Sequence, residues 1–303
     1  MKLKFSFKLL GAGVSCAIAL ALAVPLAYVL MPDPGVEPSL SSDFLARSDA
    51  DLAALVDASD EDYWEELLKV RLGDRYYPKY LESKASGQES EWAFVKEDPD
   101  LPRILIIGDS ISRGYTLPVR HELAGTANVV RVPENAGSSR NGLSQLDTWL
   151  NRKGRYDIIF VNFGIHDRRM DVNEYRQNIA AITKRLKQHA EKVYWVNTTP
   201  IPDAFPKPAD YMKPEAYRYY RKYASGLRDD ELNENARLVM TELGVDVLDL
   251  DQYVKSNSIE QLARDVHFTE PGYQALGHRI AEQSREYLSH RIAAVSPNED
   301  ASH

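Results

Sequence analysis

The stretch RILIIGDSISRGY, residues 103–115, decides the fold. It begins as a short apolar run, breaks at Gly108, Asp109 and Ser110, and continues with helical spacing. Four further apolar runs, separated by helical patterns, lie at residues 128–132, 157–164, 192–199 and 245–250. Short apolar runs that alternate with helices are typical of a parallel sheet with helices on both faces. The sequence therefore predicts an α/β domain whose ligand site lies at the carboxyl ends of the strands.

Three shorter regions are expected to flank this domain, which we place at residues 101–290. Residues 32–42 contain three prolines and are typical of a linker. Residues 43–100 begin with apolar side chains at three- and four-residue spacing, so we expect a helical N-terminal extension. Residues 291–303 are predicted to form a disordered tail.

An uncharged segment lies at residues 9–31 and is long enough to cross the hydrocarbon core of a bilayer. Lysines precede it and acidic residues follow it, which favours a cytoplasmic N-terminus and an extracytoplasmic remainder. We therefore expect an uncleaved signal-anchor, with the rest of the chain in the periplasm or at the cell surface. Cleavage near Ala27 would instead release a secreted protein. Lipidation at Cys16 is a further alternative, but Gly13 stands where a lipobox has a branched apolar residue.

The composition excludes several classes of function. The formal net charge is −8 and the pI is about 5.5, so the basic surface that nucleic-acid binding requires is missing. Cys16 is the only cysteine of the sequence, which excludes an intramolecular disulfide framework and a cysteine-rich metal site. We expect no nucleic-acid partner, no metal and no cofactor.

Two residues far apart in the sequence are candidates for nucleophilic catalysis. Ser110 follows the first apolar run, which puts its hydroxyl at a strand end and its N–H at a helix start. Alone, this position is also typical of a serine that only caps a helix. His267 comes just before a helix start marked at residues 269–271, so its ring is held at the same sheet edge. A serine needs such a base, oriented by a carboxylate, and Asp265 is the nearest one.

With these residues in place, residues 102 to about 288 resemble the SGNH (GDSL-like) hydrolases. Four sequence blocks of that family have counterparts here, in the family's order: Gly108-Asp109-Ser110, Gly137, Gly164-Ile165-His166-Asp167, and Asp265 with His267. The resemblance implies a flavodoxin-like three-layer α/β/α fold with a central parallel five-stranded sheet. It also implies a serine ester hydrolase in which Ser110 is the nucleophile, His267 the base and Asp265 the orienting acid.

The oxyanion hole implied by the resemblance consists of the Ser110 N–H, the Gly137 N–H and the side chain at position 166. Here the chain departs from the family, because His166 replaces an asparagine; an imidazole N–H can also donate. The family's acid commonly lies three residues before the histidine, where this chain has Arg264, whereas Asp265 lies two before it. A backbone carbonyl is therefore an alternative partner for the histidine.

The substrate is indicated only by the resemblance and the predicted location. We expect removal of small acyl groups, such as acetyl, from an extracellular saccharide or a related small-molecule ester. Candidate substrate contacts are Asp109, Arg140 and Arg168, and the tyrosines of residues 198–226, whose alternative role is packing. The alternative functions are a lysophospholipase or thioesterase, an acyltransferase, and a non-catalytic saccharide-binding module.

Overall fold

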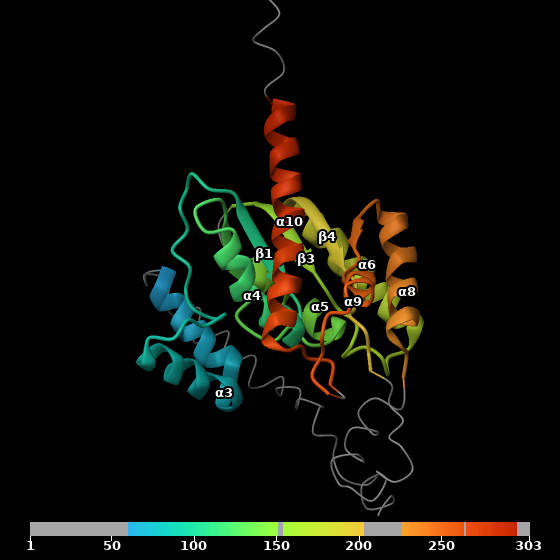
Figure 1. Cartoon of the computed structure of the whole chain (residues 1–303), viewed down its shortest axis with the longest axis horizontal. Helices are drawn as coiled ribbons and strands as arrows, with labels where there is room; N and C mark the ends of the chain where they lie inside the picture. The colour runs from blue at the N-terminus through green and yellow to red at the C-terminus, as the bar shows by residue number, and fades with distance from the viewer. Residues whose placement is uncertain (1–59, 151–153, 203–225, 264, 296–303) are drawn as a thin grey trace, which may run out of the picture. The chain divides into compact units, whose positions relative to one another are not determined.

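The computed structural model describes residues 60–150, 154–202, 226–263 and 265–295, with a five-stranded parallel sheet at the centre (Figure 1). The strand order β2-β1-β3-β4-β5 is that of flavodoxin-like sheets. The strands are β1 (Arg103–Ile107), β2 (Asn128–Arg131), β3 (Tyr156–Val161), β4 (Ala190–Val196) and β5 (Asp246–Leu248). Each overlaps one of the five apolar runs, so the predicted parallel α/β fold is confirmed.

Helices flank the sheet on both faces because the direction of strand connection reverses once. From β1 the chain steps to β2 through α4 (Ser110–Glu122), then returns past β1 to β3 through α5 (Ser139–Leu150). Right-handed crossovers place these two helices on opposite faces. Helices α6 (Val172–His189) and α8 (Asp229–Leu243) continue the α5 layer, whereas α10 (Glu270–Val295) packs on α4. The reversal beside β1 is the point where ligand sites form in such sheets.

The central strands end at the same level of the sheet. Ile107 of β1 pairs with Val161 of β3, and the next residue, Asn162, donates its N–H to the Ile107 carbonyl at 3.0 Å. The side chains of Ile107 and Val161 are fully buried, as the layers of helices on both faces require. The residues that follow β1 and β3 are therefore brought to one edge of the sheet.

Helix α10 differs from the expectation at its C-terminal end. The helix continues to Val295, past residue 291, where we expected a disordered tail to begin. No glycine or proline occurs in residues 278–295, so the sequence contains no strong helix breaker there. The predicted tail is therefore wrong for residues 291–295.

Helix α3 (Asp60–Ser86) lies in the region predicted as a helical extension and has a small core of its own. It is kinked at Gly73, whose φ of 52° and ψ of −166° are accessible to glycine. Trp64 Nε1 donates to the carbonyl of Trp92 at 2.8 Å, which ties α3 to the segment that leads into β1. The buried residues of this core are Trp64, Leu67, Leu68, Leu72, Tyr80 and Trp92.

The predicted membrane segment at 9–31, the linker at 32–42 and the first part of the extension lie outside the described residues. Within the described ranges, no helix is both long enough and apolar enough to cross a membrane. Anchoring by the N-terminal segment and an extracytoplasmic location therefore stay predictions.

Candidate active site

The side chains of Ser110, His267 and Asp265 form one chain of hydrogen bonds. His267 Nε2 lies 2.8 Å from Ser110 Oγ, and His267 Nδ1 lies 2.7 Å from Asp265 Oδ1. An ionised carboxylate only accepts, so we assign the imidazole proton to Nδ1 and the lone pair to Nε2. In this tautomer the imidazole can take the Ser110 proton, which is what makes a serine nucleophilic.

Ser110 is held by the turn between β1 and α4. Asp109 is the N-cap of α4, and its Oδ1 accepts the Ile111 N–H at 2.9 Å. The alternative in which Ser110 only caps the helix is therefore wrong, since its neighbour does so. Ser110 is the first residue of α4, and the N–H of a first helical residue has no acceptor within its own helix.

His267 lies in a short loop that backbone hydrogen bonds hold in place. The Leu262 N–H donates to the His267 carbonyl at 2.8 Å, and the Asp265 N–H donates to the Leu262 carbonyl at 2.9 Å. The His267 N–H also donates to Asp265 Oδ1 at 3.2 Å. Helix α10 follows at Glu270, near the predicted start. This tight loop lets Asp265 reach the imidazole despite the short spacing.

The loops after β2 and β3 meet the turn after β1. The Ala136 N–H donates to the Gly108 carbonyl at 3.1 Å, which ties the loop after β2 to the end of β1. Gly137 follows with a φ of 60°, in the left-handed region that favours glycine. The Asp167 carboxylate, after β3, accepts the Ser139 N–H at 2.9 Å and the Ser139 hydroxyl at 2.8 Å. Hydrogen bonds thus join the three predicted blocks at one sheet edge.

His166 lies beside the residue that precedes Ser110. Its Nε2 is 3.9 Å from Asp109 Oδ2, beyond hydrogen-bond distance, and its side chain is 28% exposed. Asp109 itself is 3% exposed and is engaged in capping α4. Asp109 therefore holds the turn and lies beside His166. It stays a candidate for substrate contact because it also lines the small pocket at this sheet edge.

The two arginines expected to contact substrate have protein partners. Arg168 is 5% exposed, and its Nε donates to the Leu227 carbonyl at 3.3 Å, so this buried side chain is not placed for substrate contact. Arg140 is exposed and forms a two-point ion pair with Glu174 of α6. It stays a candidate for substrate contact because solvent reaches it. Tyrosines 211, 217, 219, 220 and 223 lie outside the described residues.

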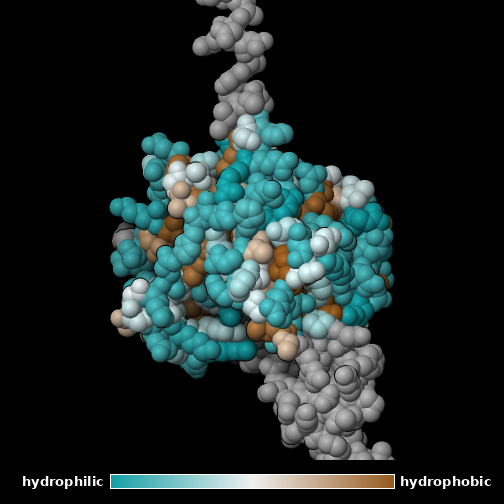
Figure 2. Space-filling model, viewed as in Figure 1, coloured by the Kyte–Doolittle hydropathy of each residue, from teal (hydrophilic) through white to brown (hydrophobic). Residues whose placement is uncertain are grey.

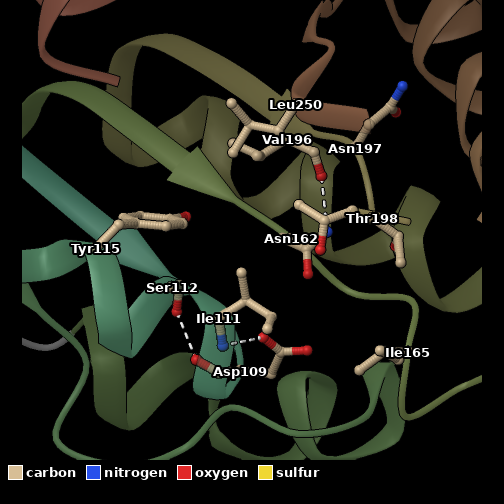
Figure 3. A pocket seen from close by; sticks show the side chains of 11 residues that line it. Asp109, Ile111, Ser112, Tyr115, Asn162, Ile165, Val196, Asn197, Thr198 and Leu250 are labelled. Carbon is tan, nitrogen blue, oxygen red and sulfur yellow. Dashed lines mark hydrogen bonds between the residues drawn. The ribbon is translucent and has the colours of Figure 1, made fainter. Parts of the chain in front are cut away.

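A small pocket lies at the carboxyl ends of β1, β3 and β4 and reaches Leu250 at the start of α9 (Leu250–Ser256) (Figure 3). Its volume is about 10 Å³, the space of about one water molecule. Asn162 lines it, but its side-chain amide donates to the Val196 carbonyl at 2.7 Å and so bridges β3 and β4. Other lining residues are Asp109, Ile111, Ser112, Tyr115, Ile165 and Thr198.

Sequence reasoning missed Arg131, a buried charge next to the site. It ends β2, is 2% exposed, and donates to the Gly108 carbonyl at 3.1 Å and the Ser112 hydroxyl at 2.8 Å. Burial lowers its pKa to about 10. The one available signal is an arginine inside the apolar run NVVRV, and arginine is rarely buried.

The burial of the Asp167 carboxyl predicts how the stability of the protein changes with pH. Burial raises its pKa to about 7, against about 4 in an unfolded chain. The folded protein therefore keeps a proton that the unfolded chain has lost, and the free energy of unfolding falls as pH rises from about 4 to about 7. Each pH unit in this interval lowers the free energy of unfolding by up to about 1.36 kcal/mol. Over about three units the ionisation of Asp167 therefore lowers it by about 4 kcal/mol at most.

The Asp167→Asn variant should lack this contribution, because its amide oxygen accepts the Ser139 N–H at every pH. Urea unfolding of both proteins between pH 4.5 and 7.5 measures the difference in slope. Parallel stability curves for the two proteins would show that Asp167 is ionised throughout this range.

The sequence matches the GDSL-like Lipase/Acylhydrolase family over residues 106–275, more than half of the chain. A search of curated proteins found no match. Similar solved structures include an inhibitor-bound aryl esterase of M. smegmatis, 19% identical, covering 61% of this chain and 99% of its own, with a TM-score of 0.46.

Two others are an acetylxylan esterase from Geobacillus stearothermophilus (15% identity, 60% and 93% coverage, TM-score 0.44) and a GDSL-like lipase from Bacteroides thetaiotaomicron (15%, 69% and 97%, TM-score 0.44). At these values the similarities say nothing about the substrate of this chain. The family match is different in kind, because it runs from β1 into α10 and so includes the segments of Ser110 and His267. The chain belongs to the GDSL-like lipase/acylhydrolase family and is an ester hydrolase.

Proposed function

We propose that this esterase removes small acyl groups through an acyl-serine intermediate, with Ser110 as nucleophile, His267 as general base and Asp265 as orienting acid. The observation that carries the proposal is the hydrogen-bond chain of 2.8 Å and 2.7 Å through the imidazole. Both distances are within the range that proton transfer and orientation require. The reaction needs neither a metal nor a cofactor.

In the first step Ser110 Oγ attacks the ester carbonyl while His267 Nε2 takes its proton. The oxyanion of the tetrahedral intermediate accepts hydrogen bonds from the Ser110 N–H, the Gly137 N–H and the His166 side chain. The intermediate collapses as His267 gives its proton to the departing alcohol. Water then attacks the acyl-serine with the same imidazole as base. The second tetrahedral intermediate collapses as His267 returns the proton to Ser110 Oγ, and the carboxylic acid leaves. Asp265 stabilises the imidazolium in both steps.

The small pocket at the carboxyl ends of the strands supports a small acyl group. It is lined by Asp109 and Ile111, the sequence neighbours of Ser110, although Ser110 itself does not line it. A volume of about 10 Å³ suits one group of methyl size. A saccharide as the alcohol part is proposed from the predicted location.

A long acyl chain requires an extended apolar groove. The face shown in Figure 2 is mainly hydrophilic, and its apolar side chains form separate patches. The large apolar side chains exposed in the described ranges are on three different helices and one loop: Leu81, Leu143, Leu238 and Leu262. This distribution favours a short acyl group over the lysophospholipase alternative.

A panel of p-nitrophenyl esters tests the proposed acyl size. We expect kcat/KM to be highest for acetyl and to fall by roughly tenfold or more from acetyl to octanoyl, because longer chains exceed the pocket. A fluorophosphonate probe should label Ser110, as mapped by peptide mass spectrometry. Highest activity on octanoyl or lauroyl esters would favour the lysophospholipase alternative. Labelling of another serine would show that Ser110 is not the nucleophile. Product analysis with a sugar acceptor separates hydrolysis from acyl transfer.

A further inference from the structure

Arg131 at the end of β2 holds the turn that carries Ser110. Its Nη1 donates to the Ser112 hydroxyl at 2.8 Å, and its Nη2 donates to the carbonyls of Gly108 and Glu134 at 3.1 Å and 3.2 Å. The guanidinium therefore contacts the chain both before and after Ser110. Because its donors are fixed in a planar fork, a guanidinium holds such acceptors in one geometry.

The Gly108 carbonyl links Arg131 to the second loop of the site. The same oxygen accepts the Ala136 N–H at 3.1 Å, and Ala136 directly precedes Gly137. The guanidinium and the loop after β2 thus share one acceptor. A shift of Arg131 would move Ser110 and Gly137, the sources of two proposed oxyanion donors, relative to each other.

The burial of Arg131 is costly, which indicates a role beyond packing. Its side chain is 2% exposed, and the acceptors named above are all uncharged oxygens. Its Nε has no hydrogen-bond partner among the described residues. An apolar side chain of similar volume is often as stable or more stable than a buried charge. What the guanidinium provides, and an apolar group does not, is the fixed geometry of the Ser110 turn.

Trp92, from the segment before β1, covers the guanidinium. Its ring is 3% exposed and lies 5.8 Å from Arg131 Cζ. Arg113 of α4 lies 5.3 Å from the same ring and pairs with Glu91 at 3.4 Å. The segment before β1 therefore shields Arg131 from water that would compete for its hydrogen bonds.

We propose that Arg131 is a positioning residue that sets the Ser110 turn and the Gly137 loop in the geometry that the oxyanion requires, without touching substrate. This inference rests on the proposed function, because it concerns the same site. A misplacement of about 1 Å in such a site is expected to cost about 10²-fold in rate.

Variants of Arg120 are the matched control for variants of Arg131. Burial also lowers the pKa of Arg120 to about 10. Its guanidinium donates to the carbonyls of Val129 and Ser90 at 3.0 Å and 3.1 Å, and these acceptors lie outside the Ser110 turn. Both arginines therefore join buried backbone segments, but only Arg131 contacts the turn.

Each arginine is replaced by lysine and by methionine in the full-length protein, which is purified in detergent to cover residues 9–31. Arg131→Lys keeps the positive charge but lacks the planar set of N–H donors that a guanidinium has. It should lower kcat for the acetyl ester by roughly 10–100-fold, with KM within about twofold. Arg120→Lys should keep kcat within about twofold. Amide hydrogen exchange at residues 108–112 should be faster in Arg131→Lys than in Arg120→Lys.

Equal kcat and equal exchange in the two lysine variants would overturn the proposal and leave Arg131 a packing residue. Arg131→Met should lose at least as much kcat as Arg131→Lys, and Arg131→Lys decides the question if the methionine variant does not fold. A failure of the proposed function gives a different result from a failure of the Arg131 proposal. The wild-type protein then neither hydrolyses the acetyl ester nor reacts with the fluorophosphonate. In that case the exchange comparison still tests whether Arg131 holds the turn.

Discussion

The Ser110→Ala variant should lose ester hydrolysis almost completely, with kcat lower by roughly 10⁴–10⁶-fold. The reason is that His267 Nε2 then has no hydroxyl to deprotonate, and no acyl-enzyme forms. Stability should change little, because Asp109 and not Ser110 caps α4. Initial rates on p-nitrophenyl acetate and the thermal unfolding midpoint measure the two effects.

The double variant Ser110→Ala/His267→Ala controls for unrelated losses. Residues that act as one unit are non-additive, so the double variant should be about as slow as Ser110→Ala alone. A Ser110→Ala protein with the wild-type rate would remove Ser110 from the mechanism. Losses that multiply in the double variant would show that the two residues act in separate steps.

The fold could be predicted because each strand is a local feature of the sequence. The strands β1 and β3 are short apolar runs, and a run buried on both faces leaves few alternatives to a covered parallel sheet. The C-terminal end of α10 at Val295 was placed too early, although the sequence marks it: residues 278–295 contain no breaker, and Pro297 follows two residues after the helix ends.

The contact of Ser110 with His267 followed from their positions, since each lies directly at the end or start of a predicted element. Arg131 and Arg168 show the limit of such reasoning. Both are buried, and their partners at Gly108 and Leu227 are distant in the sequence. Because most arginines are exposed, sequence alone predicts an exposed side chain that could contact substrate. Only the structure shows that these two are buried and bind other segments of the chain.

The site itself joins four chain segments that carry different parts of the chemistry. The turn after β1 supplies Ser110, the loop before α10 supplies the base, and the loops after β2 and β3 supply the proposed oxyanion donors. The hydrogen bonds that the Ser139 N–H and hydroxyl donate to the Asp167 carboxylate fix the last two loops to each other. The position where the chain departs from its family, His166, lies in this fixed part.

His166→Ala should lower kcat by roughly 10²–10³-fold, by analogy with the loss of one oxyanion donor. KM should barely move, because the donor acts on the developing charge and not on the bound ester. The place of His166 beside Asp109, with Nε2 3.9 Å from Oδ2, puts the ring next to the turn of Ser110. Steady-state kinetics on the acetyl ester, with thermal unfolding of each variant, give both quantities.

His166→Asn separates a donor role from a structural one. An asparagine amide supplies the N–H that the family uses, so His166→Asn should recover much of the rate lost in His166→Ala. His121→Ala is the control, because His121 is an exposed histidine that pairs with Glu89 near the far end of α4, and its loss should leave kcat within about twofold. If His166 were only structural, both substitutions at this position would lower the unfolding midpoint and act on kcat alike. An unchanged kcat in a folded His166→Ala protein would exclude His166 from the oxyanion hole and leave the Ser110 and Gly137 N–H groups as its donors.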